Sequence, residues 1–553
     1  MNRASPRNII KEILGTFPVS SEIYHTLRPK IVPPGSYALP QLAQKLQGWV
    51  SAVKSSGPLL AKDQSQRVLI VGMLKWWLEY GVVLGLLLKT TGHQVDLAFL
   101  PYRDWTSRTS RFDARRGMRY IQSCLGELKH ALGLKSLLPE RSSSNVPQAL
   151  QREIETQSKL DVQYSLQRED VDIVNDPIAA RIYRLRLQRN HDAAERAYTL
   201  LVDGDYDVVI IPNGSILEFG AVYRTARHLG VKAVTYEFGE QRNRMWLAQD
   251  SEVMRQDTTA LWEAVKGKPL SVQQRNLIET LFHARRGGKT WEQFKRQWQS
   301  GESEGAQAIR EKLKLDPNRP IVLLCTNVVG DSLALNRQVF TGGMADWLKD
   351  TVAFFEHHPE VQLVVRIHPG EMLGAGHPSV EIVKDALPAQ PDHVTVVPPE
   401  SEVNTYDLIG VAHLGLVYTT TVGLEMSMQG LPVIVAGDTH YRKKGFTDDP
   451  ESWDEYYQIV RKRLDEPRNR RLEEERVEKA WRYAYRFFFD YPFPIPWHIL
   501  SFWEDLDTTS LEEILDASRM EEYRDTLMAF TGHPIDWSRK AVTEKVEEET
   551  VER

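Results

Sequence analysis

Two stretches decide the fold of this chain: LVVRIHPGE at residues 363–371 and LGLVYTTTVGLEMSMQGLPVIVAGDTHYRKKGFT at residues 414–447. Each begins with a short apolar run of the kind found in buried parallel strands. In the second stretch, a hydroxyl-rich turn, Thr419–Thr421, opens a helix predicted over Val422–Gln429. A further strand, Pro432–Ala436, follows after a glycine. This alternation of strands and helices predicts an α/β fold with a parallel sheet.

Strand patterns separated by helices recur in both halves of the chain. The predicted strands are Arg67–Met73, Gln94–Leu100, Asp207–Ile211 and Lys232–Tyr236 in the first half, and Ile321–Thr326, Gln362–Ile367, His393–Val397, Leu414–Tyr418 and Pro432–Ala436 in the second. A charge-rich helical region is predicted over 113–200. Two successive α/β halves favour a pair of Rossmann-like domains with a ligand cleft between them.

The chain divides into four predicted parts. They are an N-terminal helical extension (1–66), a first Rossmann-like domain (67–305), a second Rossmann-like domain (306–470), and C-terminal helices with a charged tail (471–553). The connection between the domains is placed in polar sequence interrupted by Gly287–Gly288 and Gly301–Gly305. The last residues, KVEEETVER, are expected to fray.

Composition and charge argue against several classes of protein. Of the 553 residues, 42% are apolar and 26% are charged, as in ordinary soluble globular proteins. The net charge of −6 argues against a nucleic-acid binder. Cys124 and Cys325 lack the spacing of a disulfide framework or a zinc site. Because the chain shows no apolar leader and no apolar run denser than Gly81–Leu88, a cytoplasmic protein is expected.

Polar residues gather where the strands of the second half end. Ligands of open α/β sheets bind at this edge, and a helix N-terminus offers N–H groups to a phosphate. Thr419–Thr421, Arg366 and His368 therefore predict a nucleotide-phosphate site, in which His368 could assist departure of the leaving group. A turn histidine bonded to backbone and a simple threonine N-cap are the alternative interpretations.

Two more donor-site candidates lie close to this turn. Glu425 is the lone acid of an apolar helix, so a partner such as ribose hydroxyls is expected for its carboxylate; one exposed helix face is the alternative. Tyr441 and Lys444 belong to the basic loop DTHYRKKGFT (438–447) and are candidates for contact with an anionic sugar or phosphate. Charge runs of this kind are also common on solvated surface.

Further candidates follow other strands. Asn327 and Asp331, in TNVVGD, end the first strand of the second half; Asn327 could contact donor or acceptor, and Asp331 could act as acid or base. In the first half, Asn213 and the acids of EFGE end successive strands and should face the same cleft. An acceptor hydroxyl needs a base, for which Glu237 is the first candidate and Glu240 the second. Either acid could instead be a loop residue paired with an arginine.

Two surface features allow different interpretations. The stretch Arg103–Arg119, with Arg103 and Arg108, could receive an anionic acceptor or lie on an acidic membrane surface; an ordinary salt-bridged helix explains it equally well. The aromatic segment Trp481–Trp503 lacks a basic face, so packing across the two domains is favoured over an interfacial membrane anchor.

The stretch from RIHPGE (366–371) to DTHYRKKGFT (438–447) resembles bacterial capsule polysaccharide biosynthesis proteins, relatives of the β-Kdo transferases of capsule assembly. TNVVGDS (326–332) and YAYRFFFDYPFPIP (483–496) also resemble that family. The likeness is strongest over residues 320–450. It implies a GT-B fold and metal-independent glycosyl transfer from a nucleotide-activated sugar.

The resemblance also implies roles for individual residues. In related transferases that use cytidine-monophosphate sugars, a His-Pro turn and a hydroxyl-rich turn hold the nucleotide phosphate, which implies this role for His368, Pro369 and Thr419–Thr421. Glu425 falls where many GT-B enzymes bind the ribose. The turn carries threonine in place of the usual serine, which keeps the hydroxyl donor. No residue of the first half can be matched to the catalytic acid of the Kdo transferases.

These patterns together predict a cytoplasmic GT-B glycosyltransferase that acts on a cell-surface polysaccharide or glycolipid, at or near the inner face of the membrane. Its donor is a CMP-Kdo-like or other nucleotide sugar, and no metal, cofactor or nucleic acid is expected. Three alternatives remain: a teichoic-acid-type glycerophosphotransferase, a sugar-nucleotide 2-epimerase, and a catalytically inactive GT-B scaffold subunit.

Overall fold

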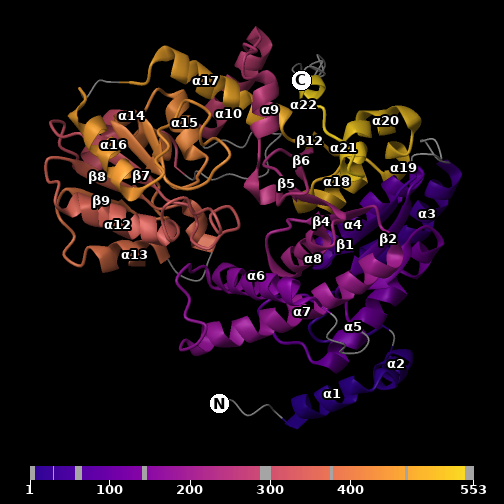
Figure 1. The fold of residues 1–553 in the computed structure, drawn as a ribbon. Helices are drawn as coiled ribbons and strands as arrows, with labels where there is room; N and C mark the ends of the chain where they lie inside the picture. Colours follow the sequence, from indigo (N-terminus) through magenta and orange to yellow (C-terminus); the bar gives the residue numbers. More distant parts are fainter. Residues whose placement is uncertain are drawn as a thin grey trace.

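The computed structural model describes residues 6–28, 30–56, 65–139, 146–286, 301–373, 378–467 and 471–541. Its ribbon forms two lobes, each built around one β-sheet (Figure 1). The first lobe runs from indigo to magenta and the second is mainly orange, whereas the yellow C-terminal helices return to the first lobe. Gly287–Gly288 and the tail KVEEETVER lie outside the described residues.

In the described part of the chain, the sheet of the first lobe has seven strands in the order β12-β6-β5-β4-β1-β2-β3. The strands are β1 (Arg67–Gly72), β2 (Gln94–Phe99), β3 (Gly133–Ser136), β4 (Val208–Pro212), β5 (Lys232–Phe238), β6 (Arg244–Gln249) and β12 (Phe493–Pro494). β1 to β5 are parallel, while β6 and β12 run antiparallel to their neighbours. The four strands predicted in the first half are confirmed, because their apolar runs are buried on both faces of the sheet.

Three strands of this sheet, β3, β6 and β12, are absent from the sequence prediction. β3 interrupts the region 113–200, so the prediction of helix throughout that region is wrong there. β3 is a short edge strand of half-buried residues, and β12 has only two residues. Such short edge strands carry little periodic signal.

Helices pack against this sheet and at its ends. They are α1 (Pro6–Thr16), α2 (Pro18–Leu27), α3 (Pro40–Ser56), α4 (Lys75–Thr90), α5 (Arg111–Cys124), α6 (Gln148–Leu166), α7 (Pro177–Gly204) and α8 (Leu217–His228). α4 is buried along nearly its whole length, which explains its almost unbroken apolar sequence. α1 and α2 contact α5 at one end of the molecule (Figure 1).

The sheet of the second lobe is entirely parallel among the described residues. Its order is β11-β10-β7-β8-β9, with β7 (Ile321–Cys325), β8 (Gln362–Arg366), β9 (Val394–Val397), β10 (Leu414–Val417) and β11 (Val433–Val435). All five strands predicted for this half are confirmed. Their buried, mostly β-branched residues suit a sheet that is covered on both faces.

Helices of the second lobe surround this sheet. They are α11 (Ala306–Lys312), α12 (Met344–Glu356), α13 (Pro378–Ala386), α14 (Thr405–Val411), α15 (Val422–Met428), α16 (Trp453–Asp465) and α17 (Glu474–Tyr485). Two earlier helices, α9 (Thr259–Val265) and α10 (Val272–Arg286), also place their apolar residues in the core of the second lobe. Arg285, near the end of α10, pairs with Glu240 of the first lobe, so α10 contacts both lobes.

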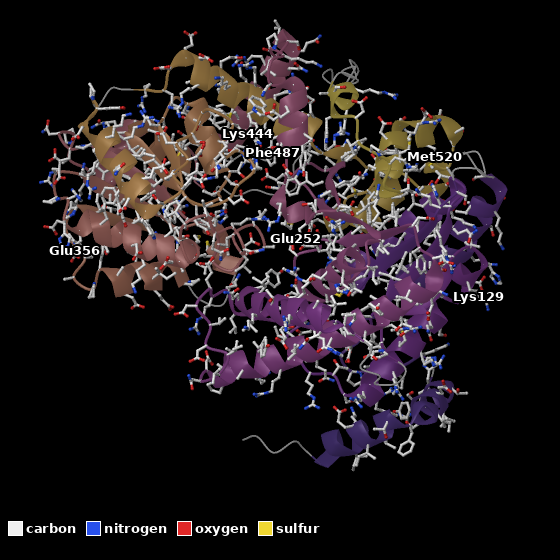
Figure 2. The ribbon with its side chains drawn as sticks, in the orientation of Figure 1. Lys129, Glu252, Glu356, Lys444, Phe487 and Met520 are labelled. Atoms are coloured by element: carbon white, nitrogen blue, oxygen red, sulfur yellow. The ribbon has the colours of Figure 1, made fainter. Side chains whose placement is uncertain are left out.

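The aromatic segment Trp481–Trp503 packs across the two lobes, as the favoured interpretation predicted. Phe487, labelled in Figure 2, stacks on His440 of the second lobe, with ring centroids 3.8 Å apart, and on Trp246 of β6, with ring centroids 6.3 Å apart. After β12 the chain forms helices whose apolar residues join the core of the first lobe, namely α18 (Phe502–Thr508), α19 (Leu511–Ile514), α20 (Ala517–Glu522) and α21 (Arg524–Phe530); α22 (Trp537–Lys540) follows. Most rings of the segment are buried and so are not available as an interfacial anchor.

Two Rossmann-like α/β lobes thus form the GT-B architecture that the sequence predicts. The predicted limits of its parts, at residues 66, 305 and 470, stay predictions. None of the helices in the described ranges is long and apolar enough to cross a membrane.

Candidate functional site

A cavity of about 460 Å³ lies between the two lobes. Most of the residues singled out by the sequence line it, namely Asn213, Glu237, Glu240, Asn327, Asp331, Arg366, His368, Pro369, Thr419, Thr420, Thr421 and Glu425. They come from the carboxyl ends of β4, β5, β7, β8 and β10, or from the loops and helix that follow. The ligand-binding edges of the two sheets therefore face one common space.

His368 lies just beyond β8 and lines this cavity. Its backbone N–H donates to Thr326 Oγ1 at 3.0 Å, and its Nδ1 accepts from the Gly370 N–H at 2.9 Å. Burial, reinforced by the charge of Arg366, lowers the pKa of His368 to about 4. The imidazole is therefore neutral at pH 7, and because Nδ1 is an acceptor, the ring proton resides on Nε2.

The threonine turn is fixed from behind by its neighbours. Thr419 is held through its N–H, which donates to Asn327 Oδ1 at 3.1 Å, and through its hydroxyl, which donates to the Leu333 carbonyl at 3.1 Å. The Tyr441 hydroxyl donates to the Thr420 carbonyl at 2.7 Å. Thr420 and Thr421 line the cavity in front of this scaffold. Tyr441 is fully buried behind the turn, outside the cavity lining, and so supports the threonines from the rear.

The Arg366 guanidinium is engaged with backbone. It donates to the carbonyl of Pro398 at 2.7 Å and to that of Ser401 at 3.5 Å. Burial lowers the pKa of this arginine. Arg366 thus joins the end of β8 to the loop after β9, and its charge helps to keep His368 neutral.

Glu425 is buried, as the sequence predicts, and it has protein partners. Its Oε1 accepts from Arg285 Nε at 2.6 Å, and its Oε2 accepts from the Tyr406 hydroxyl at 2.9 Å. The same guanidinium pairs with Glu240 of the first lobe. A carboxylate has about four lone-pair positions, so Glu425 keeps acceptor capacity for a ligand hydroxyl. Glu240, in contrast, is committed to an ion pair.

Glu237 lies at the end of β5, on the first-lobe side of the cavity. Its Oε2 accepts from Asn213 Nδ2 and its Oε1 from the Phe238 N–H, both at 3.0 Å. These two hydrogen bonds fix the orientation of the Glu237 carboxyl group. Burial raises the pKa of Tyr164, and the nearby carboxylates of Asp331 and Glu237 raise it further. Asp331 belongs to the second lobe and Glu237 to the first, so the two acids lie near the same tyrosine from opposite lobes.

The backbone around the first-lobe half of the cavity is strained. Four non-glycine residues that line it have positive φ: Leu74 at 60°, Asn213 at 58°, Leu217 at 56° and Gln256 at 51°. Such conformations cost on the order of 1–3 kcal/mol each and cluster at functional sites. The buried Asp161 stabilises one of them, since its Oδ1 accepts from the Leu217 N–H at 2.6 Å.

Sequence reasoning missed several residues of the cavity. Arg285 belongs to an ordinary amphipathic helix, 140 residues before its partner Glu425, so no local pattern marks it. Arg255 and Arg337, which also line the cavity, come from a short turn and a loop. Trp76, the second residue of α4, carried a weak sequence signal, since it lies three residues beyond the predicted strand Arg67–Met73; in the structure it is 47% exposed, which is high for a tryptophan.

Besides Tyr441, three predicted residues lie outside the cavity lining, namely Arg103, Arg108 and Lys444. The Arg108 side chain pairs with Glu12 of α1 at 3.1 Å, and the Arg103 N–H donates to the Gly35 carbonyl at 2.9 Å. Lys444 Nζ donates to Thr259 Oγ1 at 3.1 Å. The contacts of the arginine-rich stretch are those of a salt-bridged helix. Acceptor contacts of Arg103 and Arg108 stay a prediction.

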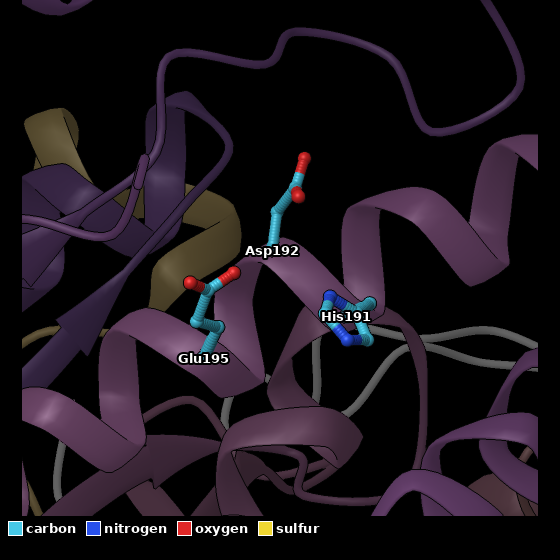
Figure 3. A group of neighbouring side chains, drawn as sticks. All are labelled: His191, Asp192 and Glu195. Atoms are coloured by element: carbon cyan, nitrogen blue, oxygen red, sulfur yellow. The ribbon is translucent and has the colours of Figure 1, made fainter. Parts of the chain in front are cut away.

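One acidic group on α7, away from the cavity, has the residue types of a metal site. Potential ligand atoms of His191, Asp192 and Glu195 lie within 4.8 Å of one another (Figure 3). Burial raises the pKa of Asp192 to about 6. Clusters of acidic residues occur commonly without an ion, and nothing else at this group indicates a ligand.

Residues 275–468 match the model of a protein family described as capsule polysaccharide biosynthesis protein. This segment is similar to that family over the matched residues. The predicted resemblance is therefore confirmed over the part of the chain that supplies the second-lobe side of the cavity. No curated protein matches the chain.

Solved structures align at low identity. The beta Kdo 2,4 transferase KpsC of Thermosulfurimonas dismutans is 17% identical, with a TM-score of 0.34, over 53% of this chain and 83% of that one. The beta Kdo 2,7 transferase of the same organism is 16% identical, with a TM-score of 0.31, over 55% and 83%. A UDP-GlcNAc 2-epimerase from Neisseria meningitidis is 12% identical, with a TM-score of 0.23, over 76% and 99%.

Proposed function

We propose that this protein is a glycosyltransferase that moves a sugar from a nucleotide-activated donor to a cell-surface polysaccharide or glycolipid. One observation carries the proposal: residues at the carboxyl ends of two facing sheets share a single cavity. The second lobe would bind the nucleotide through His368 and the threonine turn. The first lobe would present the acceptor beside Glu237.

The second-lobe residues suit a phosphate ester that becomes a leaving group. The neutral His368 carries its proton on Nε2, and Thr420 and Thr421 add hydroxyl donors on the same side of the cavity. As the bond from sugar to phosphate breaks, negative charge grows on the phosphate oxygens. Preorganised donors that meet this charge often contribute more to the rate than any other feature of an active site. Glu425 would accept a hydrogen bond from a ribose hydroxyl.

The first-lobe residues suit removal of a proton from the acceptor. Asn213 Nδ2 and the Phe238 N–H position the Glu237 carboxyl group, which would take the proton from the hydroxyl of the acceptor sugar. Glu240 is a weaker candidate because Arg285 neutralises it. Asp331 faces Tyr164 from the second lobe and is the alternative acid or base.

The resemblance implies that transfer requires no metal ion, and this remains part of the proposal. Assay of sugar transfer with EDTA and then with added Mg²⁺ tests it directly. Full activity in EDTA would support the proposal, and activity that returns only with Mg²⁺ would contradict it.

The first experiment is a thermal-shift titration of the full chain against CMP, UDP, GDP, CDP and ADP. A ligand that binds only the folded state raises its stability by RT ln(1 + [L]/Kd), so the cognate nucleotide should stand out. A CMP response supports a Kdo-like donor, and a UDP or GDP response supports a hexose donor. A CDP response would instead favour glycerophosphate transfer. Silence across the panel would contradict the proposed function.

A further inference from the structure

Arg337 is a buried arginine in the loop between β7 and α12. Its side chain lines the cavity although only 4% of the residue is exposed. Among the residues that the structure describes, none forms a hydrogen bond or an ion pair with its guanidinium. The backbone of Arg337 is nevertheless held in place, because its carbonyl accepts a hydrogen bond from the Asp438 N–H at 2.8 Å. Buried arginines are normally paired, since an isolated charge is costly to remove from water.

A second arginine approaches from the other lobe. Arg255, in the turn that follows β6, also lines the cavity and repels Arg337. Two acids partly offset these charges: Arg255 lies 3.5 Å from Glu252 Oε2 and 3.5 Å from Asp438 Oδ2. Glu252, labelled in Figure 2, also pairs with Arg224 at 3.9 Å, so this acid already serves two arginines.

The charge of Arg337 persists in spite of this environment. Burial, followed by repulsion from Arg255, lowers its pKa to about 10, so the guanidinium is still protonated at neutral pH. The structure therefore keeps a cation where burial and a like charge both disfavour it. Features of this kind usually serve a ligand that supplies the missing partner.

We infer that Arg337, together with Arg255, forms an anion-binding subsite for a carboxylate or phosphate group of the substrate. A planar guanidinium binds either oxyanion through two parallel N–H donors, which a lysine cannot do. The inference rests on the proposed function in that the anion belongs to the substrate that occupies the same cavity. Since the two arginines come from different lobes, the bound anion would also hold the lobes together.

Two groups could supply the anion. One is the phosphate of the donor nucleotide, because the loop of Arg337 adjoins the threonine turn through the hydrogen bond from the Thr419 hydroxyl to the Leu333 carbonyl. The other is an acidic group on the transferred sugar or on the acceptor. Both use the same oxyanion chemistry, and binding measurements can separate them.

The test compares the wild-type chain with Arg337→Gln and Arg337→Lys by calorimetric titration. The probes are CMP, UDP, inorganic pyrophosphate and D-glucuronate, with D-glucose as the uncharged control. Loss of a charge-assisted hydrogen bond should weaken the binding of the recognised anion about tenfold to hundredfold. Arg337→Lys should recover only part of the affinity for the anion, because lysine lacks the two parallel N–H donors of the guanidinium. The binding of D-glucose should be the same in all three proteins.

The pattern of losses identifies the source of the anion. Weaker binding of CMP, UDP and pyrophosphate in Arg337→Gln assigns the subsite to phosphate. Unchanged nucleotide binding with weaker glucuronate binding assigns it to a sugar carboxylate. Wild-type affinities for every probe in Arg337→Gln would overturn the inference. A wild-type chain that binds no nucleotide, while Arg337→Gln loses pyrophosphate or glucuronate, would refute the proposed function and leave the subsite standing.

Thermal unfolding without ligand keeps the test interpretable. If Arg337 serves a ligand, Arg337→Gln should unfold at the same or a higher temperature, because a buried charge is removed. A structural arginine would show a clear drop instead, which would also overturn the inference. The matched control is Arg319→Gln, which removes an exposed partner of Asp316 at 3.5 Å and should leave all probe affinities unchanged.

Discussion

Arg285 Nε lies 2.6 Å from Glu425 Oε1, and the opposite side of the same guanidinium pairs with Glu240. One residue of α10 thus connects the helix after the threonine turn to the loop after β5. Burial raises the pKa of Glu425, and the charge of Arg285 opposes this shift. The contact joins the two lobes at the edge of the cavity.

Arg285→Ala should therefore destabilise the protein strongly. It leaves Glu425 buried without its cation and Glu240 without its partner. Breaking such a pair costs about 3–5 kcal/mol when it is fully buried, and we expect about 2–4 kcal/mol here because Arg285 is 19% exposed. Urea unfolding followed by tryptophan fluorescence measures the change. The control is Arg275→Ala, on the same helix, whose partly exposed pair with Glu478 should contribute less than about 1 kcal/mol. Equal losses in both variants would contradict this account.

His368→Ala should weaken nucleotide binding without unfolding the chain. A hydrogen bond to a charged phosphate contributes about 1.5–3 kcal/mol, so the dissociation constant should rise roughly tenfold to hundredfold. Because the pKa of His368 is about 4, its neutral Nε2–H is the donor, and affinity should stay constant between pH 7 and 8.5. Calorimetric titration checks both points. His358→Ala, which removes a partly exposed partner of Glu360, is the control and should bind nucleotide normally.

Glu237→Gln should reduce turnover while leaving nucleotide affinity unchanged. A positioned general base contributes about 10²- to 10⁴-fold, and glutamine keeps the shape of the side chain but accepts no proton. Single-turnover assays with saturating donor measure the loss. Glu240→Gln, three residues further along the chain, is the matched variant, and its effect should appear mainly in stability, through Arg285. Full turnover in Glu237→Gln would place the base elsewhere, with Asp331→Asn as the next variant.

The second lobe could be predicted from sequence because its signals are local. β7, β8 and β10 are short apolar runs, and the polar residues that line the cavity follow them directly, as His368 and Thr419–Thr421 do. The rule that ligands bind at the carboxyl ends of parallel strands then gathers these residues into one site.

The remaining features depend on contacts between distant parts of the chain. Whether Glu425 meets a ligand or a protein cation depends on Arg285, which a separate helix supplies. Arg337 is an arginine in an irregular loop, and only its burial distinguishes it from surface residues. The edge strands β3 and β12 exist because neighbouring strands offer free pairing edges, a property of the assembled sheet.

A carboxylate of the first lobe also caps a helix of the second. Glu169, in the loop between α6 and α7, accepts from the Ala345 N–H at 2.7 Å in the first turn of α12. Burial raises the pKa of Glu169 to about 7, although the N–H groups of Ala345 and Met344 oppose the shift. The interface between the lobes therefore contains an acid that titrates near neutral pH.

The sign of this shift predicts how stability depends on pH. The folded protein keeps a proton on Glu169 between about pH 4.5 and 7, where the unfolded chain has released it, so this stabilisation is complete below about pH 4.5 and is lost as the pH rises through about 7. Glu169→Gln should flatten the decline, by up to about 1.4 kcal/mol per pH unit. Chemical unfolding at pH 5, 6, 7 and 8 measures it. Since Glu79 has a pKa raised to about 7 by burial and remains in both proteins, the difference between wild type and variant isolates Glu169. The control is Glu153→Gln, an exposed substitution on α6, which should leave the dependence of unfolding free energy on pH unaltered. If the curve of Glu169→Gln runs parallel to that of the wild type, Glu169 does not titrate at this interface.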